Sequence, residues 1–209
     1  MNEVFNLKVK IKPVLPILIH SGVYEGPCRV GDEKTLDPEF ERLQARKNFE
    51  RFCKEVRSRL IEDGELLDPA VIEWGEDWII PEEEIAKLDR DSTNVDFYLI
   101  ANAGLTQYPS IEIARRYGKP IVKIGQISSV DISAYLRSRG MEGYALIDIE
   151  ELNRFVRLFK VKKSLTNTRI LVVDAGNLLP VGVVSSVWDL EDIKTVSYTH
   201  LTLPTTERV

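Results

Sequence analysis

The chain has 209 residues, of which 44% are hydrophobic and 29% are charged, and its formal net charge is -5. This composition is typical of a globular domain, and the negative charge argues against a general nucleic-acid binder, which needs a basic face. Two cysteines, Cys28 and Cys53, are too few for a disulfide framework and predict reduced thiols in a cytoplasmic protein. The longest apolar run, 14–19, is too short to cross a membrane, and no signal-peptide pattern is present.

Apolar strands and helical patterns alternate through the first half of the chain. Residues 14–19 predict the first strand, and residues 8–12 are either an extended lead-in segment or part of the same strand. An Asp-Pro pair at 37–38 predicts the start of a helix, which apolar side chains at three- and four-residue spacing extend. Residues 69–74 predict a second strand, and residues 81–88 predict a short crossover helix.

A central strand, helix and strand come next. Residues 95–101 form an apolar run that ends in the small, polar turn 102–104, as expected of a strand covered on both faces. Residues 110–117 predict a helix that Gly118 closes, and residues 121–124 predict the next strand. These elements predict a right-handed βαβ unit, with its ligand site at the carboxyl ends of the strands.

The alternation continues beyond this unit. Ser128 or Ser129 is expected to cap a further helix, and residues 144–147 predict a fifth strand. A capping-box pattern at Asp148 begins another helix. Five alternations by about residue 161 predict an α/β fold of the flavodoxin-like or Rossmann-like kind, a parallel sheet with helices on both faces.

Residues 162–209 predict a linker, the start of a second domain and a tail. The polar residues 162–168 show no periodicity, a new apolar strand starts at Arg169, and its domain is incomplete. From about Ser197 the chain resembles the translated read-through of a sequencing adapter, so we exclude this tail from functional reasoning and treat His20 as the native histidine. The expected organisation is an amino-terminal α/β domain (1–161), a linker (162–168), the start of a truncated second α/β domain (169–196) and an artefactual tail (197–209).

Known catalytic motifs are missing from the sequence. No Gly-x-Gly-x-x-Gly follows the first strand, no phosphate-binding loop occurs, and Ile19 stands where a nucleophile elbow needs its first glycine. Polar or amphipathic residues do follow the predicted strands: His20, Trp74, Asn102 and Gln126. Such residues suit the binding of a sugar, whose C–H groups an aromatic ring covers and whose hydroxyls amide and imidazole groups bind. Alternatively, each one caps a loop or packs at an interface.

A family resemblance extends these observations. Residues 177–193, after an α/β domain that contains 95–104 and 117–122, resemble the amino-terminal part of an L-fucose isomerase-like sugar isomerase. The resemblance implies an aldose-ketose isomerase, an intramolecular oxidoreductase of carbohydrate metabolism, that uses a divalent metal, commonly manganese. The family's metal ligands lie further along the chain and have no matching positions here. We therefore assign no catalytic or metal-binding residue and expect this fragment to be inactive and to bind no metal.

The resemblance also implies a role for this part of the parent protein. An amino-terminal domain of this family helps to form a homo-oligomer and contributes substrate contacts, which His20 or Trp74 could supply. Two other hypotheses remain open. One is a non-catalytic sugar- or effector-binding module with two α/β lobes, and the other is a domain that serves oligomerisation alone. In each case we expect neither a nucleic acid nor a membrane as partner.

Overall fold

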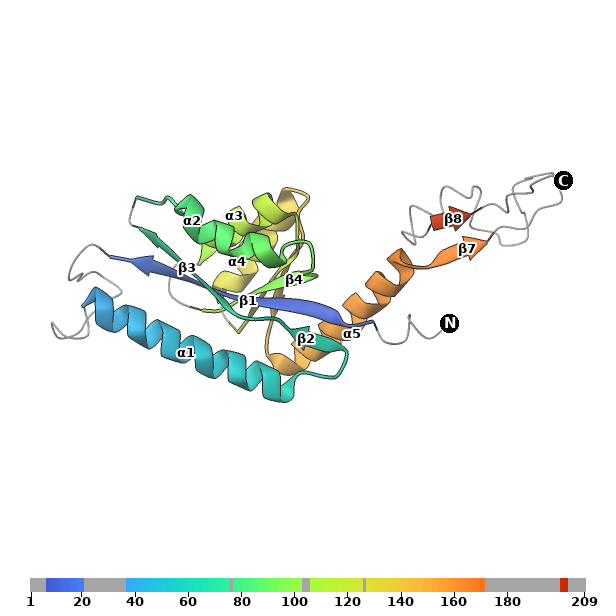
Figure 1. Cartoon of the computed structure of the whole chain (residues 1–209), viewed down its shortest axis with the longest axis horizontal. Helices are drawn as coiled ribbons and strands as arrows, with labels where there is room; N and C mark the ends of the chain where they lie inside the picture. The colour runs from blue at the N-terminus through green and yellow to red at the C-terminus, as the bar shows by residue number, and fades with distance from the viewer. Residues whose placement is uncertain are drawn as a thin grey trace. The chain divides into compact units, whose positions relative to one another are not determined.

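The computed structural model describes most of the chain (Figure 1). It forms two compact units, Lys8–Phe155 and a second one of residues 1–7 with 156–209, and each is treated by itself. Among the described residues, no helix is long and apolar enough to span a bilayer. The described residues are 7–20, 37–75, 77–102, 106–125, 127–171 and 200–202.

A six-stranded parallel sheet forms the centre of the unit Lys8–Phe155. The spatial order is β2-β1-β4-β5-β6, and β3 pairs with the same edge of β1 as β2, further along the strand. If β2 and β3 count as one interrupted strand, this is the flavodoxin-like order. The predicted fold class is therefore confirmed. The strands are β1 (Val9–Ile19), β2 (Gly64–Leu66), β3 (Ala70–Gly75), β4 (Phe97–Ile100), β5 (Ile121–Ile124) and β6 (Gly143–Leu146).

β1 contains two prolines, Pro13 and Pro16, although proline cannot donate a ladder hydrogen bond. Alternate residues of a parallel strand bond to opposite neighbours, and the Val14 carbonyl accepts from the Ala101 N–H on the β4 side. Pro13 therefore faces the other neighbour, where residues 67–69 separate β2 from β3. Pro16 faces the β4 side, but Val14 is the last residue of β1 that pairs with β4. Neither proline interrupts a ladder, so β1 is one long strand, which confirms the alternative that residues 8–12 belong to the same strand as 14–19.

Helices cover both faces of the sheet (Figure 1). One face packs against η2, α3 and α4 through a buried cluster that includes Ile72, Tyr98 and Ile113. The other face packs against α1, where Leu15 lies in a cluster with Phe49. The helices are α1 (Pro38–Arg59), α2 (Glu82–Ile85), the 3-10 helix η2 (Ala86–Asp91), α3 (Gln107–Tyr117), α4 (Ile127–Ser138) and α5 (Ile149–Thr166).

Helix ends follow the sequence signals at several points. The Asp37 side chain accepts from the Glu39 backbone N–H (3.2 Å) and Pro38 fills the first turn of α1, as predicted. Gly118 closes α3 with φ of 60°, a left-handed conformation in which glycine carries no Cβ penalty. The Glu151 side chain accepts from the Ile147 N–H (2.5 Å), and Asp148 accepts from the Glu151 N–H (2.8 Å) at the start of α5. The predicted cap at Asp148 is thus confirmed, while the reciprocal bond of a capping box goes to the residue before it instead of to the Asp148 N–H.

Other boundaries differ from the prediction. α5 continues to Thr166, so most of the expected linker 162–168 is helical, because lysine and leucine are good helix formers even without a clear apolar stripe. β2 was not predicted, since it has only three residues. Beyond α5, β7 (Arg169–Leu171) pairs in parallel with β8 (His200–Thr202). The rest of the predicted second domain, 172–196, lies outside the described residues, and the origin of the tail stays a prediction.

Cys53 lies on the buried face of α1, in the same cluster as Phe49, and its thiol is free. Burial raises the pKa of this thiol to about 11, an effect that the charge of Arg57 partly opposes. Because the thiolate is the reactive form, we expect iodoacetamide to alkylate Cys53 about 100-fold more slowly in the folded protein than in urea at pH 8. Mass spectrometry of a Cys28→Ser variant would measure both rates. Equal rates would show that this part of the core is open.

Candidate functional site

A cleft of about 560 Å³ opens where β1 and β3 end. This volume lies within the range of small-molecule sites. In a flavodoxin-like sheet the topological switch point falls between β1 and β4, so the cleft is on the opposite side of β1 from the switch point. Its lining residues come from β1, α1, β3, α2 and the segments beside them: Ile19, His20, Arg42, Glu73, Trp74, Gly75, Asp77, Pro81, Glu83 and Glu84.

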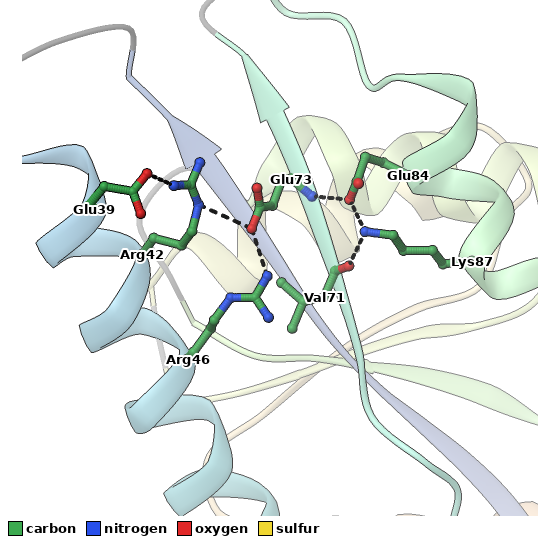
Figure 2. A network of polar contacts seen from close by, with 7 residues as sticks. All are labelled: Glu39, Arg42, Arg46, Val71, Glu73, Glu84 and Lys87. Carbon is green, nitrogen blue, oxygen red and sulfur yellow. Dashed lines mark hydrogen bonds and ion pairs between the residues drawn. The ribbon is translucent and has the colours of Figure 1, made fainter.

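Ion pairs connect α1 to β3 along one wall of the cleft (Figure 2). The Arg46 Nη2 atom lies 2.7 Å from Glu73 Oε1, and the Arg42 Nε atom lies 3.3 Å from the same oxygen. Arg42 also donates to Glu39, and this hydrogen bond is the main reason why the pKa of Arg42 is raised above its usual value. Arg42 therefore remains charged, with two carboxylates beside it.

The opposite wall is connected to β3 through Glu84 of α2 (Figure 2). Its Oε2 atom accepts from the Glu73 backbone N–H (2.8 Å) and from Lys87 Nζ (2.5 Å). Lys87 Nζ also donates to the Val71 carbonyl (3.4 Å). Glu73 thus binds α1 through its side chain and α2 through its backbone. Both walls are held at fixed positions relative to the strand between them.

Trp74 is a lining residue of this site, with only 2% of its surface exposed. Its ring centroid is 5.4 Å from that of Trp78 and 5.8 Å from that of Tyr108. The indole Nε1–H of Trp74 has no acceptor among the described residues. Buried indole N–H groups usually have one, so the unpaired donor of this lining residue needs an explanation.

Trp78 is the exposed member of this aromatic group. It is 55% exposed and has φ of 60°, which is rare for a bulky residue. Asp77 supports the turn by accepting from the Ile79 backbone N–H (3.1 Å). The solvent-facing aromatic surface near the cleft therefore belongs to Trp78, and the stacking face that the sequence suggested for Trp74 is largely covered.

The four residues predicted from strand ends have different positions. His20 and Trp74 both line the cleft, so the structure brings these two together. Asn102 is not among its lining residues, and its Nδ2 donates to the Ile124 carbonyl (2.9 Å), which joins the ends of β4 and β5. This hydrogen bond is consistent with the alternative interpretation of a loop cap, and substrate binding by Asn102 stays a prediction. Gln126 lies outside the described residues.

Sequence reasoning missed the charged residues of the site. Glu73 stands inside the predicted strand 69–74, between Ile72 and Trp74, which are both buried on the opposite face. A carboxylate within a strand covered on both faces needs a cationic partner, and this requirement could have directed attention to Glu73. The sequence did not indicate that Arg42 and Arg46 supply the charge, because they come from a different element.

The lining groups offer donors and acceptors together. Four carboxylates (Glu73, Asp77, Glu83, Glu84) contribute acceptors, and the Arg42 guanidinium contributes donors. Within the described part of the chain, no three His, Cys, Asp or Glu residues are grouped so that they could hold a metal ion. The arrangement can bind a polar organic ligand, and we assign it no metal chemistry.

The chain was compared with protein-family models, with curated proteins and with solved structures. No family model, curated protein or solved structure matches it. The functional interpretation therefore depends on the fold and on the residues of the cleft.

Proposed function

We propose that the cleft at the ends of β1 and β3 binds a small polyhydroxylated molecule, a sugar. The observation that carries this proposal is that Trp74, a lining residue of the cleft, has a buried Nε1–H with no acceptor among the described residues. Leaving such a donor unpaired costs about 1–3 kcal/mol. A ligand oxygen that accepts from it would recover that free energy.

The rest of the lining favours a hydroxyl group over other acceptors. A hydroxyl both donates and accepts, so one sugar oxygen can accept from Trp74 and donate to a carboxylate such as Glu73 or Glu84. A ligand that only accepts would meet four carboxylates in the same cleft, where Arg42 already pairs with Glu39 and Glu73. His20, in the same lining, can bind a second hydroxyl through its imidazole.

The wider proposal is that the parent protein is an L-fucose isomerase-like aldose-ketose isomerase. In it, this domain would supply substrate contacts and part of a homo-oligomer. The parent's divalent metal, commonly manganese, would hold two neighbouring sugar oxygens. Because the described residues do not fit a metal, no step of the isomerisation is assigned to them. The rival hypothesis, a sugar- or effector-binding module, shares the cleft and lacks the metal. Coding sequence beyond residue 196 distinguishes the two, since only the isomerase requires downstream metal ligands.

A Trp74→Phe substitution tests the proposed contact. It keeps most of the ring and removes the N–H, so we expect the affinity for the sugar to fall roughly five- to tenfold, as for the loss of one neutral hydrogen bond. Isothermal titration calorimetry of the full chain with L-fucose and L-arabinose would measure the dissociation constants.

Trp78→Phe is the matched control, because Trp78 is not a lining residue of the cleft and should keep the wild-type affinity. If Trp74→Phe and wild type bind a sugar equally well, the proposed contact is wrong. If the wild-type chain binds neither sugar, the proposed ligand class is wrong.

A further inference from the structure

The domain contains two buried lysines, and their ammonium groups have different partners. The Lys12 ammonium on β1 forms an ion pair with Asp91 at the end of η2. Lys123 on β5 is only 1% exposed, and its Nζ donates to the Thr106 hydroxyl, its one hydrogen-bond partner among the described residues. No described carboxylate contacts it. An ammonium group has three donors, so a single neutral hydroxyl satisfies neither its charge nor its hydrogen-bonding capacity.

Two helices begin near this lysine. Thr106 is the N-cap residue of α3, but its side chain makes no capping hydrogen bond and accepts from Lys123 instead. α4 begins shortly after β5, the strand that carries Lys123. Neither helix has an acidic residue in its first turn, whereas α1 and α5 have two each. Neither first turn therefore supplies a carboxylate to compensate the partial positive charge of its helix N-terminus.

A second unsatisfied group lies at the same end of the sheet. Ser129, in the first turn of α4, is 2% exposed, and its Oγ has no hydrogen-bond partner among the described residues. The neighbouring Ser133, one turn further along, donates to the Gly143 carbonyl (2.6 Å). A serine hydroxyl could satisfy itself within the helix, as Ser110 does by donating to the Thr106 carbonyl (2.6 Å). Ser129 does not.

We propose that the carboxyl end of β5, between the first turns of α3 and α4, binds a small oxyanion, the phosphate or carboxylate group of a ligand. The anion would neutralise Lys123, accept from the Ser129 hydroxyl and lie at the positive ends of two helices. Charge-assisted hydrogen bonds of this kind are the strong ones. This site is separate from the sugar cleft, because neither Lys123 nor Ser129 lines that cleft.

The protonation behaviour of Lys123 is consistent with this proposal. Burial lowers the pKa of the amine to about 8, and the described residues contribute no carboxylate that would raise it again. A bound anion would favour the charged form and raise the pKa. NMR titration of the Lys123 side chain with and without phosphate measures this shift directly. We expect a clear upward shift on binding.

Calorimetric titration of the full chain in Tris-chloride buffer at constant ionic strength tests the site. The probes are sodium phosphate and sodium acetate, each compared with sodium chloride. We expect saturable binding of at least one oxyanion, weakened about tenfold or more in Lys123→Met, since a hydrogen bond to a charged group is lost. Lys119→Met removes the same charge from the turn before β5 and should bind as wild type does.

Ser129→Ala is a second variant, which removes only an unsatisfied hydroxyl. It tests the proposed site even if Lys123→Met does not fold. We expect it also to weaken binding. Binding of both probes would identify a carboxylate as sufficient, and binding of phosphate alone would identify a phosphoryl group. The proposal is overturned if neither oxyanion binds saturably, or if the Lys123 and Ser129 variants bind as tightly as Lys119→Met.

Discussion

Replacing Phe97 with alanine is expected to lower the free energy of unfolding by about 3–5 kcal/mol, the usual cost of removing a large aromatic side chain from a core. Phe97 is fully buried at the start of β4, a central strand of the sheet. Its ring lies 5.3 Å, centroid to centroid, from that of Phe155 in an edge-to-face arrangement. The truncation therefore removes both buried apolar area and an aromatic contact.

Urea unfolding followed by far-UV circular dichroism would measure this change. Phe40→Ala is the matched control, because Phe40 lies in the first turn of α1 and is only partly buried. We expect its cost to be less than half as large. Similar losses for the two variants would contradict the central position of Phe97 in the core.

The buried amine of Lys123 should make stability rise with pH over an alkaline range. Burial lowers the pKa of Lys123 in the folded protein from 10.5 to about 8. Between these two values the unfolded chain binds more protons than the folded one, so the free energy of unfolding increases as pH rises. The cost of burying the charge is fully present below pH 8 and disappears above 10.5. A shift of this size corresponds to about 3 kcal/mol.

The comparison with Lys123→Met isolates this effect from other groups that titrate at high pH, such as the thiol of Cys53. Unfolding in urea would be measured at pH 7.5 and pH 10.5 in a buffer without phosphate or carboxylate. We expect Lys123→Met to be more stable than wild type by about 3 kcal/mol at the lower pH and about equal at the higher pH. A difference that is the same at both values would show that the amine is not desolvated.

Much of the fold followed from periodicity and end signals in the sequence. The strand-helix alternation, the Asp37 cap and the Gly118 closure are local, and each is determined by neighbouring residues. The predicted cap at Ser128 or Ser129 is wrong, because α4 already begins at Ile127. The extension of α5 to Thr166 was not predicted either, since helix ends depend on tertiary contacts as much as on the residues there. β2 is stabilised by its pairing with β1 and has too few residues to show a period.

The site was harder to predict because its parts come from distant segments. His20 and Trp74 were found because strand ends collect at one edge of a parallel sheet. In the sequence, Arg42 is one of the polar positions of an amphipathic helix, which usually face solvent. Its contact with Glu73 depends on the packing of α1 beside β3, which the sequence pattern does not specify. Similarly, Lys123 is a charged residue within an apolar strand of the sequence. Its burial depends on the packing of helices on the sheet, which the strand pattern alone does not predict.

Pro13 and Pro16 have a consequence for which partners β1 can accept. Eleven mostly apolar residues in extended conformation would otherwise be a template for another chain during folding. A two-residue shift of β1 against β4 would place Pro16 opposite a carbonyl that needs an N–H donor. A shift of β1 against β2 and β3 would likewise place Pro13 opposite a carbonyl that it cannot satisfy. The two prolines thus penalise wrong registers and intermolecular pairing, while costing little in the native sheet.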